Sequence, residues 1–409
     1  MKSNQIILLV ITLMLGGAAL TVAVDPSVVY TRLAIGNPAT MIPSASIEEP
    51  MPEPAVKEKP EIEVVFVLDT TGSMGGLIEG AKQKIWSIIN ELKQGQPEPD
   101  LKIGLVAYRD RSDDYVTRHS PLTEDIDLVY SDLMAFRAAG GGDTPESVNQ
   151  ALHEALTHMQ WSTDTDTLRV VFLVGDAPPK MNYQDDVKYT VSCGLAMKKD
   201  IIINTIQCGN AQETRDVWKS IAQMSSGGYA MIRQDGGMVV AATPMDAEID
   251  KLNQAINATV IPYGTQEQQA IARRKLGSAM NIAGFASAER SEYLSYAEPA
   301  AAITGREDLT AEIMSKRIVL DEIEMDHLPS ELQGEEKAEV IAQVQSNIEK
   351  RLRYQEELKD ALARRKAYLD DRAGSTSGTE PADAFDTKVK EMIRAQAAAK
   401  SIVYEDKGD

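Results

Sequence analysis

The sequence predicts an α/β fold, with a doubly wound, mostly parallel sheet that has one antiparallel edge strand and is followed by an α-helical C-terminal region. Apolar runs of strand length recur in the first part of the chain, and amphipathic helical patterns fall between most of them. Continuous apolar runs are typical of parallel strands that helices cover on both faces. After the last run, only helical periodicity remains. The predicted strands are residues 63–69, 102–109, 169–175, 201–207 and 228–233.

One further strand is expected at the edge of this sheet. Residues 115–122 are shorter and more polar than the other runs, and only the turn 110–114 separates them from the strand before. A connection this short joins antiparallel neighbours, and a polar strand suits an exposed edge. In open sheets of this kind, functional groups gather outside the carboxyl ends of the parallel strands.

The first 60 residues precede the predicted sheet. Lys2 is followed by an apolar, uncharged run that extends to Val24 and ends in small residues, which is typical of an export signal. Residues 1–24 are therefore expected to be a signal peptide, or an N-terminal membrane anchor because the run is nearly long enough to span a bilayer. We favour cleavage. Residues 25–60 are rich in proline and are expected to be a linker. The protein is thus expected to be exported, and to be periplasmic, secreted or membrane-anchored outside the cytoplasm.

Length and charge limit the possible partners. The chain has 409 residues, which is more than one compact domain needs. It carries 42 basic and 62 acidic side chains, so its net charge is −20. This charge argues against nucleic acid, or an anionic membrane surface, as the main partner. It favours cations or basic protein surfaces.

The end of the first predicted strand carries a concentration of oxygen atoms. Asp69 ends the strand, and Thr71 and Ser73 follow it at alternate positions. Side chains at alternate positions of an extended segment point the same way, so the carboxylate and the two hydroxyls are expected to converge. Such a group, between the carboxyl end of a parallel strand and the start of a helix, predicts a site for a small, hard cation.

Two other polar turns are expected at the same rim of the sheet. Residues 140–146 open a helical pattern, and Asp176 follows another buried strand. Each turn also has a simple structural explanation. Thr144 suits the N-cap, Pro145 the first helical position and Glu146 the first turn, while Asp176 suits the start of a proline-containing turn. Together, however, the three turns favour one shared site.

These residues resemble the metal-ion-dependent adhesion site (MIDAS) of von Willebrand factor type A (vWA) domains. The family pattern is D-x-S-x-S, a later Thr and a later Asp. The segments D-T-T-G-S-M, V-A-Y-R-D, G-G-D-T-P-E and G-D-A-P-P are similar to a subtype of exported bacterial proteins. The resemblance covers about residues 61–262 and implies a Rossmann-like vWA domain. Thr71 stands where many members have Ser, and Gly175-Asp176-Ala177 replaces the common T-D-G, but neither change removes a ligand.

The resemblance also implies a function. Ser73 and Thr71 would bind the metal directly or through water, Thr144 would join in the ligand-bound state, and Asp69 and Asp176 would act largely through waters. A divalent cation held in this way keeps a position for a strong oxygen ligand. Mg²⁺ suits the arrangement, and Mn²⁺ would also fit. The expected function is a metal-dependent protein–protein interaction module for adhesion or assembly, whose partner presents Asp or Glu. No residue is assigned a catalytic role, so the protein is not expected to be an enzyme.

Two alternatives stay open. The segment D-T-T-G-S also resembles the D-K-T-G-T motif of phosphoryl-transfer enzymes that form an aspartyl-phosphate. In that case Asp69 would be the nucleophile, and Lys180 is the candidate for stabilising the phosphoryl group. In the second alternative, the metal site is vestigial and the protein is a scaffold that acts through its helical C-terminal region.

The histidines and cysteines give weaker signals. Cys193 and Cys208 lie in a predicted helix and at the end of the next strand, so they could form a disulfide in an exported protein or remain buried thiols. The four histidines show no metal-binding spacing along the sequence. They are His119, His153, His158 and His327.

Helical patterns fill the rest of the chain. Residues 263–372 are expected to form a helical module that contains a long helix over residues 329–372. A coiled coil is possible, but the apolar seam is interrupted, so packing within the chain is favoured and the oligomeric state stays open. Residues 373–383 are expected to be a flexible linker, and residues 384–409 an amphipathic helix and tail that could dock on a partner. The apolar positions expected on one face of the long helix are Ile341, Val344, Ile348, Leu352 and Leu362.

Overall fold

The computed structural model describes residues 11–15, 18–25, 28–30, 59–142, 145–375 and 384–404. The chain divides into two compact units, Met1–Lys57 and Glu58–Asp409. The first unit contains three short antiparallel strands in the order β1-β2-β3. Much of the predicted signal or anchor segment and of the linker lies outside the described residues. Within the described part of the chain, no helix combines the length and the apolar character needed to cross a membrane. The three strands are β1 (Ile11–Leu15), β2 (Ala18–Asp25) and β3 (Val28–Tyr30).

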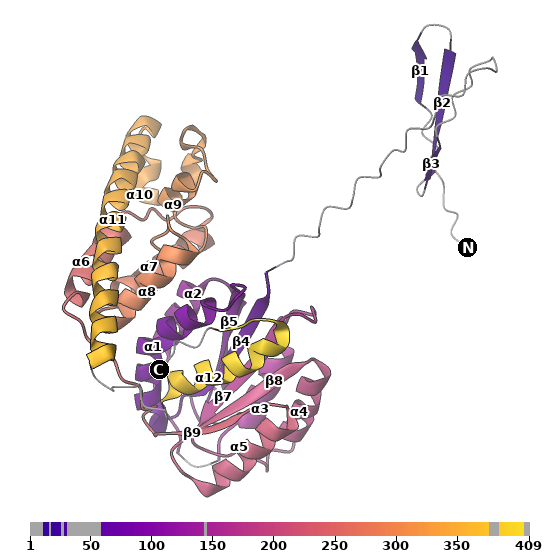
Figure 1. Cartoon of the computed structure of the whole chain (residues 1–409), viewed down its shortest axis with the longest axis vertical. Helices are drawn as coiled ribbons and strands as arrows, with labels where there is room; N and C mark the ends of the chain where they lie inside the picture. Colours follow the sequence, from indigo (N-terminus) through magenta and orange to yellow (C-terminus); the bar gives the residue numbers. More distant parts are fainter. Residues whose placement is uncertain are drawn as a thin grey trace. The chain divides into compact units, whose positions relative to one another are not determined.

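A six-stranded sheet in the order β6-β5-β4-β7-β8-β9 forms the centre of the second unit (Figure 1). Its neighbouring strands are parallel, except that β6 runs antiparallel to β5 at one edge. The predicted doubly wound sheet and its antiparallel edge strand are confirmed. The strands are β4 (Glu61–Asp69), β5 (Asp100–Tyr108), β6 (Thr117–Thr123), β7 (Leu168–Gly175), β8 (Ile201–Cys208) and β9 (Tyr229–Ile232).

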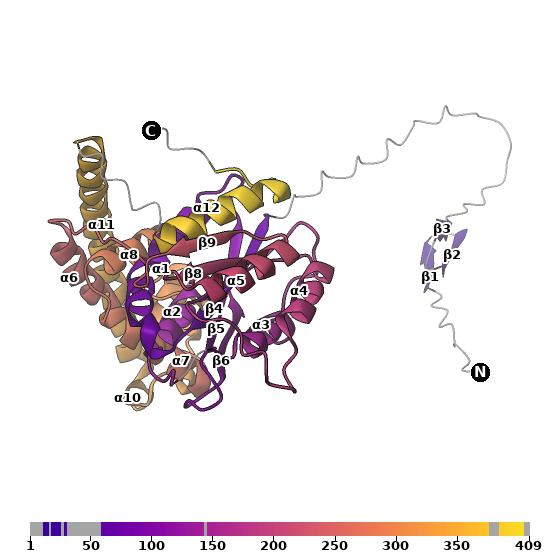
Figure 2. The same ribbon diagram turned by 90° about the horizontal axis from the view of Figure 1, so that it is seen from below.

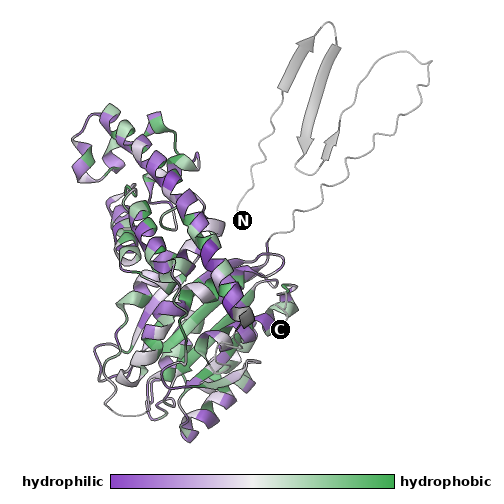
Figure 3. Cartoon of the chain, turned by 60° about the vertical axis from the view of Figure 1, so that its left-hand side comes forward, coloured by the Kyte–Doolittle hydropathy of each residue, from purple (hydrophilic) through white to green (hydrophobic). Residues whose placement is uncertain are grey.

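Helices cover both faces of this sheet because successive side chains of a strand point to opposite faces. Phe66 packs in the core with α1, α2 and α12, whereas Val65 and Val67 pack in a second core with α3, α4 and α5. Figure 3 shows the apolar strands enclosed between helices whose outer faces are hydrophilic. The helices are α1 (Gly75–Lys93), preceded by the short 3₁₀ helix η1 (Gly72–Met74), α2 (Ile126–Ala135), α3 (Val148–Thr157), α4 (Tyr189–Lys198), α5 (Gln212–Met224) and α12 (Phe385–Ala397), followed by η4 (Ala398–Lys400).

The predicted C-terminal helical region is also confirmed. The long helix α11 packs along α6 and contacts α8 and α9, while α8 packs on α1 and joins the module to the sheet domain (Figure 1). The predicted long helix is divided in two. The first part, α10, ends just before Gly334, and the second part, α11, begins at Lys337. The elements are α6 (Asp246–Asn257), α7 (Gln266–Met280), α8 (Phe285–Ala297), α9 (Leu309–Met314), η2 (Leu320–Glu322), η3 (Met325–His327), α10 (Ser330–Gln333) and α11 (Lys337–Ser375).

The prediction that Leu352 lies on the buried face of α11 is wrong. Its neighbour Arg351 is fully buried, whereas Leu352 is 56% exposed. The guanidinium pairs with the buried carboxylate of Asp308 at 2.6 Å and donates from Nε to the hydroxyl of Thr259 at 2.7 Å. A buried charge is tolerated when it is paired and hydrogen-bonded, so Arg351 occupies the inward position that the apolar pattern assigned to Leu352.

The last helix, α12, packs on the sheet domain of its own chain (Figure 2). The Phe385 ring lies 6.2 Å from the Phe66 ring, centroid to centroid. Asp386 pairs with Lys84 of α1 at 3.2 Å, and both side chains are buried. Beyond the helix, Val403 forms an antiparallel bridge with Gln96. The docking contact that the amphipathic pattern indicated is therefore made within the chain.

Candidate metal centre

The predicted site lies where three neighbouring strands end. Asp69 is the last residue of β4, Asp176 directly follows β7, and Arg109 directly follows β5. In the sheet, β4 lies between β5 and β7, so the turns that follow these strands meet at one rim. Thr71 and Ser73 continue from Asp69 toward the start of α1.

Asp69 is fully buried and its two carboxylate oxygens have different surroundings. Oδ1 accepts hydrogen bonds from the Thr71 backbone N–H at 2.8 Å and from the Thr71 hydroxyl at 2.6 Å. Oδ2 has no hydrogen-bond partner among the described residues. The Thr71 and Ser73 hydroxyl oxygens lie 3.4 Å apart. The structure therefore brings together the carboxylate and the two hydroxyls that the sequence predicted to converge.

Burial raises the pKa of the Asp69 carboxyl from 3.8 to about 7. The negative charge of Asp176 raises it further, while the hydrogen bonds from Thr71 and the positive charge of Arg109 oppose the change. Desolvation and a like charge both disfavour the ionised form of a carboxyl group. A cation beside Asp69 would stabilise the ionised carboxylate and so lower its pKa.

Thr144 lies outside the described residues, as does Asp143. The residues on both sides of them do lie at the site. Gly141 adopts φ +78°, and a β-carbon added there would lie 3.0 Å from the β-carbon of Thr71. The Gly72 backbone N–H also donates to the carbonyl of Gly140 at 3.3 Å. The glycine-rich turn thus packs closely against the segment that follows Asp69.

Glu146 belongs to the site, and the interpretation of this residue as part of the first turn of a helix is wrong. Helix α3 begins at Val148, whereas Glu146 forms a parallel bridge with Pro179 in the turn that follows Asp176. The side chain is 2% exposed, and its Oε2 has no hydrogen-bond partner among the described residues. Burial, followed by the charge of Asp69 and other carboxylates, raises the pKa of Glu146 to about 8.

Asp176 is half-buried and is oriented by Gln234, which lies in the turn that follows β9. The Gln234 amide donates from Nε2 to Asp176 Oδ2 at 2.7 Å and to the Ser73 carbonyl at 3.3 Å. Beside this contact lies an open pocket of about 400 Å³. Its lining residues are Ser73, Gly76, Arg233, Gln234 and Asp235.

The structure explains why Gly175 precedes Asp176. A β-carbon at this position would lie 2.4 Å from the hydroxyl of Tyr108 and 3.1 Å from Oδ2 of Asp69. No side chain fits there without moving the Asp69 carboxylate or its neighbour. The absence of a side chain at Gly175 therefore preserves the geometry of the site.

A fourth carboxylate, Asp110, anchors the turns around the site. It accepts hydrogen bonds from the Ser147 hydroxyl at 2.8 Å and from the Lys180 ammonium at 3.0 Å. Burial raises its pKa, but these hydrogen bonds and one from Tyr183 outweigh burial and hold the pKa below its usual range. The lysine that phosphoryl transfer would require is thus engaged with Asp110, and Asp69 is fully buried. The geometry does not favour the aspartyl-phosphate alternative.

The two cysteines are free and buried. Cys193 lies in α4, and Cys208 ends β8. Burial raises the pKa of both thiols, that of Cys193 to about 11. Of the two possibilities that the sequence left open, the structure contains the reduced pair.

Sequence reasoning missed two residues of the site, Glu146 and Gln234. Glu146 stands in the same glycine-rich turn as Thr144, so its place next to a predicted ligand was an available signal. Gln234 carried no such signal, because it reaches Asp176 only through the position of β9 in the sheet.

A family model described as the von Willebrand factor A domain matches residues 63–243. The von Willebrand factor A domain-containing protein 7 of Rattus norvegicus is 38% identical over 121 residues, which are 30% of this chain and 12% of that protein. The chain therefore spans only 12% of the length of this curated relative.

Two solved structures are similar over a part of the chain. One is proximal thread matrix protein 1 from the mussel byssus with a zinc-occupied MIDAS motif, at 15% identity, 43% coverage of each chain and a TM-score of 0.34. The other is the VWA domain of SpRpn10, at 14% identity, with 43% of this chain and 89% of that chain covered and a TM-score of 0.33.

Proposed function

We propose that residues 63–243, which match a family model of the von Willebrand factor A domain, bind a divalent cation at an adhesion site and, through the cation, a carboxylate of a partner protein. The proposed ligands in the described residues are Asp69, Thr71, Ser73 and Asp176, and Thr144 is the fifth. The protein then serves adhesion or assembly.

The observation that carries this proposal is the unpartnered Oδ2 of the buried Asp69 carboxylate. A buried polar atom without a partner costs about 1–3 kcal/mol, and buried charges are normally paired or bound to metal. Glu146 repeats the pattern, with a buried Oε2 that also lacks a described partner. Two such oxygens at one rim fit a bound cation better than they fit a purely structural turn.

The donor set suits a hard cation. Carboxylates and hydroxyls are oxygen ligands of the kind that Mg²⁺ prefers, and Mn²⁺ accepts the same set. When bound, the cation would supply a Lewis-acidic position for an oxygen of the partner. Thr71 and Ser73 would present hydroxyls to it, while Gln234 orients Asp176. Helix α1 begins at Gly75, two residues after Ser73, so its N-terminal dipole adds positive potential near the proposed site.

The open pocket beside Ser73 provides room for the residues that flank the partner's carboxylate. Arg233 and Asp235, which pair at 2.8 Å, line it with both signs of charge and are more than half exposed. Exposed pairs of this kind contribute little to stability, so they can exchange partners on binding. The pocket would therefore select among acidic sequences by their neighbouring residues.

The test is a peptide array in which each peptide that contains Asp or Glu is matched by its Asn or Gln version. We expect the full chain to bind a subset of the acidic peptides in Mg²⁺ or Mn²⁺, to lose them in EDTA, and to ignore their amide versions. Asp69→Ala should bind as the wild type does in EDTA. Equal binding to acidic and amide peptides would contradict the proposal.

The scaffold alternative predicts a different result in the same assay. Binding that survives EDTA and Asp69→Ala, but is lost when surface residues of α11 are changed, would assign the function to the helical region. The control variant is Asp235→Asn, which lies in the pocket but is not a proposed ligand. It should change which peptides bind, without removing the dependence on metal.

We also propose that the protein is exported, because an apolar run follows Lys2 near the start of the chain. Mass spectrometry of the N-terminus after expression with the intact segment tests this. A mature chain that begins near Val24 supports a cleaved signal. An intact chain in the membrane fraction supports an anchor, and an intact chain in the cytoplasm contradicts export.

A further inference from the structure

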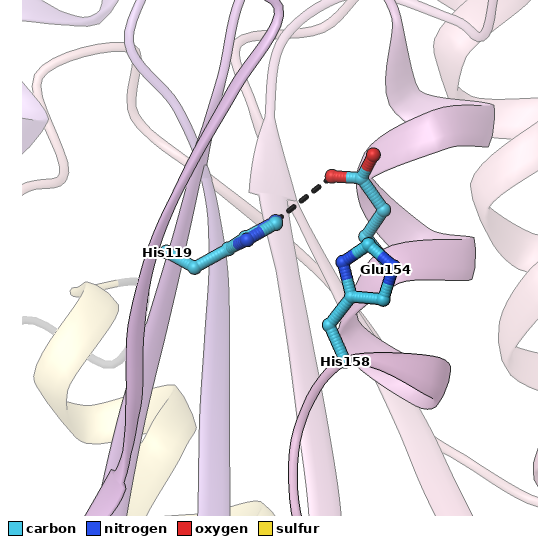
Figure 4. Close-up of side chains that lie close together, drawn as sticks. All are labelled: His119, Glu154 and His158. Atoms are coloured by element: carbon cyan, nitrogen blue, oxygen red, sulfur yellow. Dashed lines mark hydrogen bonds and ion pairs between the residues drawn. The ribbon is translucent and has the colours of Figure 1, made fainter.

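Away from the adhesion site, the structure brings together two histidines and a glutamate that are far apart in the sequence (Figure 4). His119 lies on the edge strand β6, Glu154 on α3, and His158 at the C-terminal end of α3. Glu154 and His158 are four residues apart, so they share one face of the helix. Glu154 and His158 thus have a spacing that suits metal ligands, which the expectation from the four histidines alone did not include.

The donor atoms of these side chains lie within 4.8 Å of one another. His119 Nε2 lies 2.8 Å from Glu154 Oε2, and the two imidazole rings are 5.3 Å apart at 81°. In a tetrahedral zinc site with bonds of about 2.1 Å, donor atoms are roughly 3.4 Å apart. Changes of side-chain rotamer on an open surface can close the remaining difference, and Figure 4 shows the three groups facing one space.

Glu154 is prepared to act as an anionic ligand. Gln150 donates to its Oε1 at 2.9 Å, which leaves Oε2 directed toward the histidines. Burial raises the pKa of this carboxyl, but hydrogen bonds from His119, Thr117 and Gln150 outweigh burial and lower it to about 2. The carboxylate is thus ionised, and the hydrogen bonds hold it in place.

We propose that His119, Glu154 and His158 form a second metal site, which binds a zinc-class divalent ion. Two imidazole nitrogens and one carboxylate oxygen match the ligands of Zn²⁺, and also of Cu²⁺ and Ni²⁺, whereas Mg²⁺ prefers oxygen alone. Three protein ligands leave a position for water or for a donor from another molecule. The ion would join the edge strand of the sheet to α3.

A second group in the described residues provides a control. Glu324, Asp326 and His327 also lie within 4.8 Å of one another, but they contribute one imidazole and lie within four consecutive positions. If zinc bound non-specifically to surface clusters of acidic and histidine side chains, changing His327 would also lower the zinc affinity. Zinc bound at the proposed site would keep its affinity when His327 is changed.

The test is a calorimetric titration of the full chain with Zn²⁺ in the presence of excess Mg²⁺. We expect about one Zn²⁺ per chain at this site, with affinity at least about tenfold weaker in His119→Ala, His158→Ala and Glu154→Gln. His327→Ala and Asp69→Ala should retain it. Because Asp69→Ala removes the adhesion site from the comparison, failure of the proposed function would leave this result unchanged.

Electron paramagnetic resonance of the Cu²⁺ form gives a readout that structural damage does not imitate. The wild type should show splitting from imidazole nitrogen, which His119→Ala combined with His158→Ala should remove while circular dichroism in EDTA stays the same. Unchanged Zn²⁺ affinity in that double variant, or a Cu²⁺ spectrum with oxygen ligands only, would overturn the proposal.

Discussion

Replacing Phe385 with Ala should destabilise the whole sheet domain, although residue 385 lies more than 150 positions beyond Ile232, where the last strand ends. Phe385 is 2% exposed and belongs to the same apolar core as Phe66, on the face of the sheet that α1 covers. Val389 and Ile393 follow it along α12 and are fully buried. The helix is thus part of the layer that covers the sheet.

The expected loss follows from this burial. Truncating a buried Phe to Ala removes its transfer free energy and leaves a cavity, which together cost about 3–5 kcal/mol. Natural domains have free energies of unfolding of about 5–15 kcal/mol. Phe385→Ala should therefore remove a large share of the stability of the domain. Asp386→Ala should also destabilise the domain, because it removes a carboxylate that pairs with the buried Lys84 ammonium.

Urea unfolding, followed by tryptophan fluorescence, measures this effect. Trp86 and Trp218 are fully buried on opposite faces of the sheet, so their emission reports the integrity of both layers. Glu391→Ala is the control, since Glu391 lies on the exposed face of α12 and pairs only with Lys388 among the contacts described. It should change the free energy of unfolding by less than about 1 kcal/mol. A Phe385→Ala variant as stable as this control would refute the argument that α12 completes the core.

Three further predictions concern the domain that contains the sheet. The pKa of Asp69 is about 7 in the folded chain and about 3.9 in an unfolded chain. In the metal-free protein, the folded state therefore binds the proton more tightly. The stability that this proton contributes is complete below about pH 4 and is lost as the pH rises through 7. Thermal scans in EDTA should show this decline, and Asp69→Asn should flatten it. Gly175→Ala should cost about 1–3 kcal/mol in urea unfolding, because its β-carbon would lie 2.4 Å from the Tyr108 hydroxyl. Cys193 and Cys208 are buried thiols, so a reducing agent should not change Tm, and thiol reagents should label them only on unfolding.

The sheet could be predicted because its strands are buried on both faces and therefore appear as continuous apolar runs. The turns that follow them could be placed at one rim for the same reason, since parallel strands end at the same edge. The same rule places Asp69 and Asp176 at the same rim of the sheet. The ligand role of Thr144 stays a prediction, because that residue lies outside the described chain.

Long-range contacts could not be predicted. An amphipathic pattern shows which face of a helix is apolar but not what covers it, so the destination of α12 was open. On α11, Arg351 lies inward because Asp308 is buried opposite it, and no local pattern contains that partner. His119 meets Glu154 only through the position of the edge strand beside α3. Each of these contacts depends on where the fold places two distant segments.

Calorimetric titration of the full chain with Mg²⁺ tests the central claim most directly. The comparison includes Asp69→Ala, Asp176→Ala and, as a control that leaves the proposed metal site intact, His119→Ala. We predict about one Mg²⁺ per chain for the wild type and for His119→Ala, and loss of binding in both aspartate variants while circular dichroism shows that they remain folded. Unchanged Mg²⁺ binding in Asp69→Ala would contradict the assignment of the metal centre to this rim of the sheet.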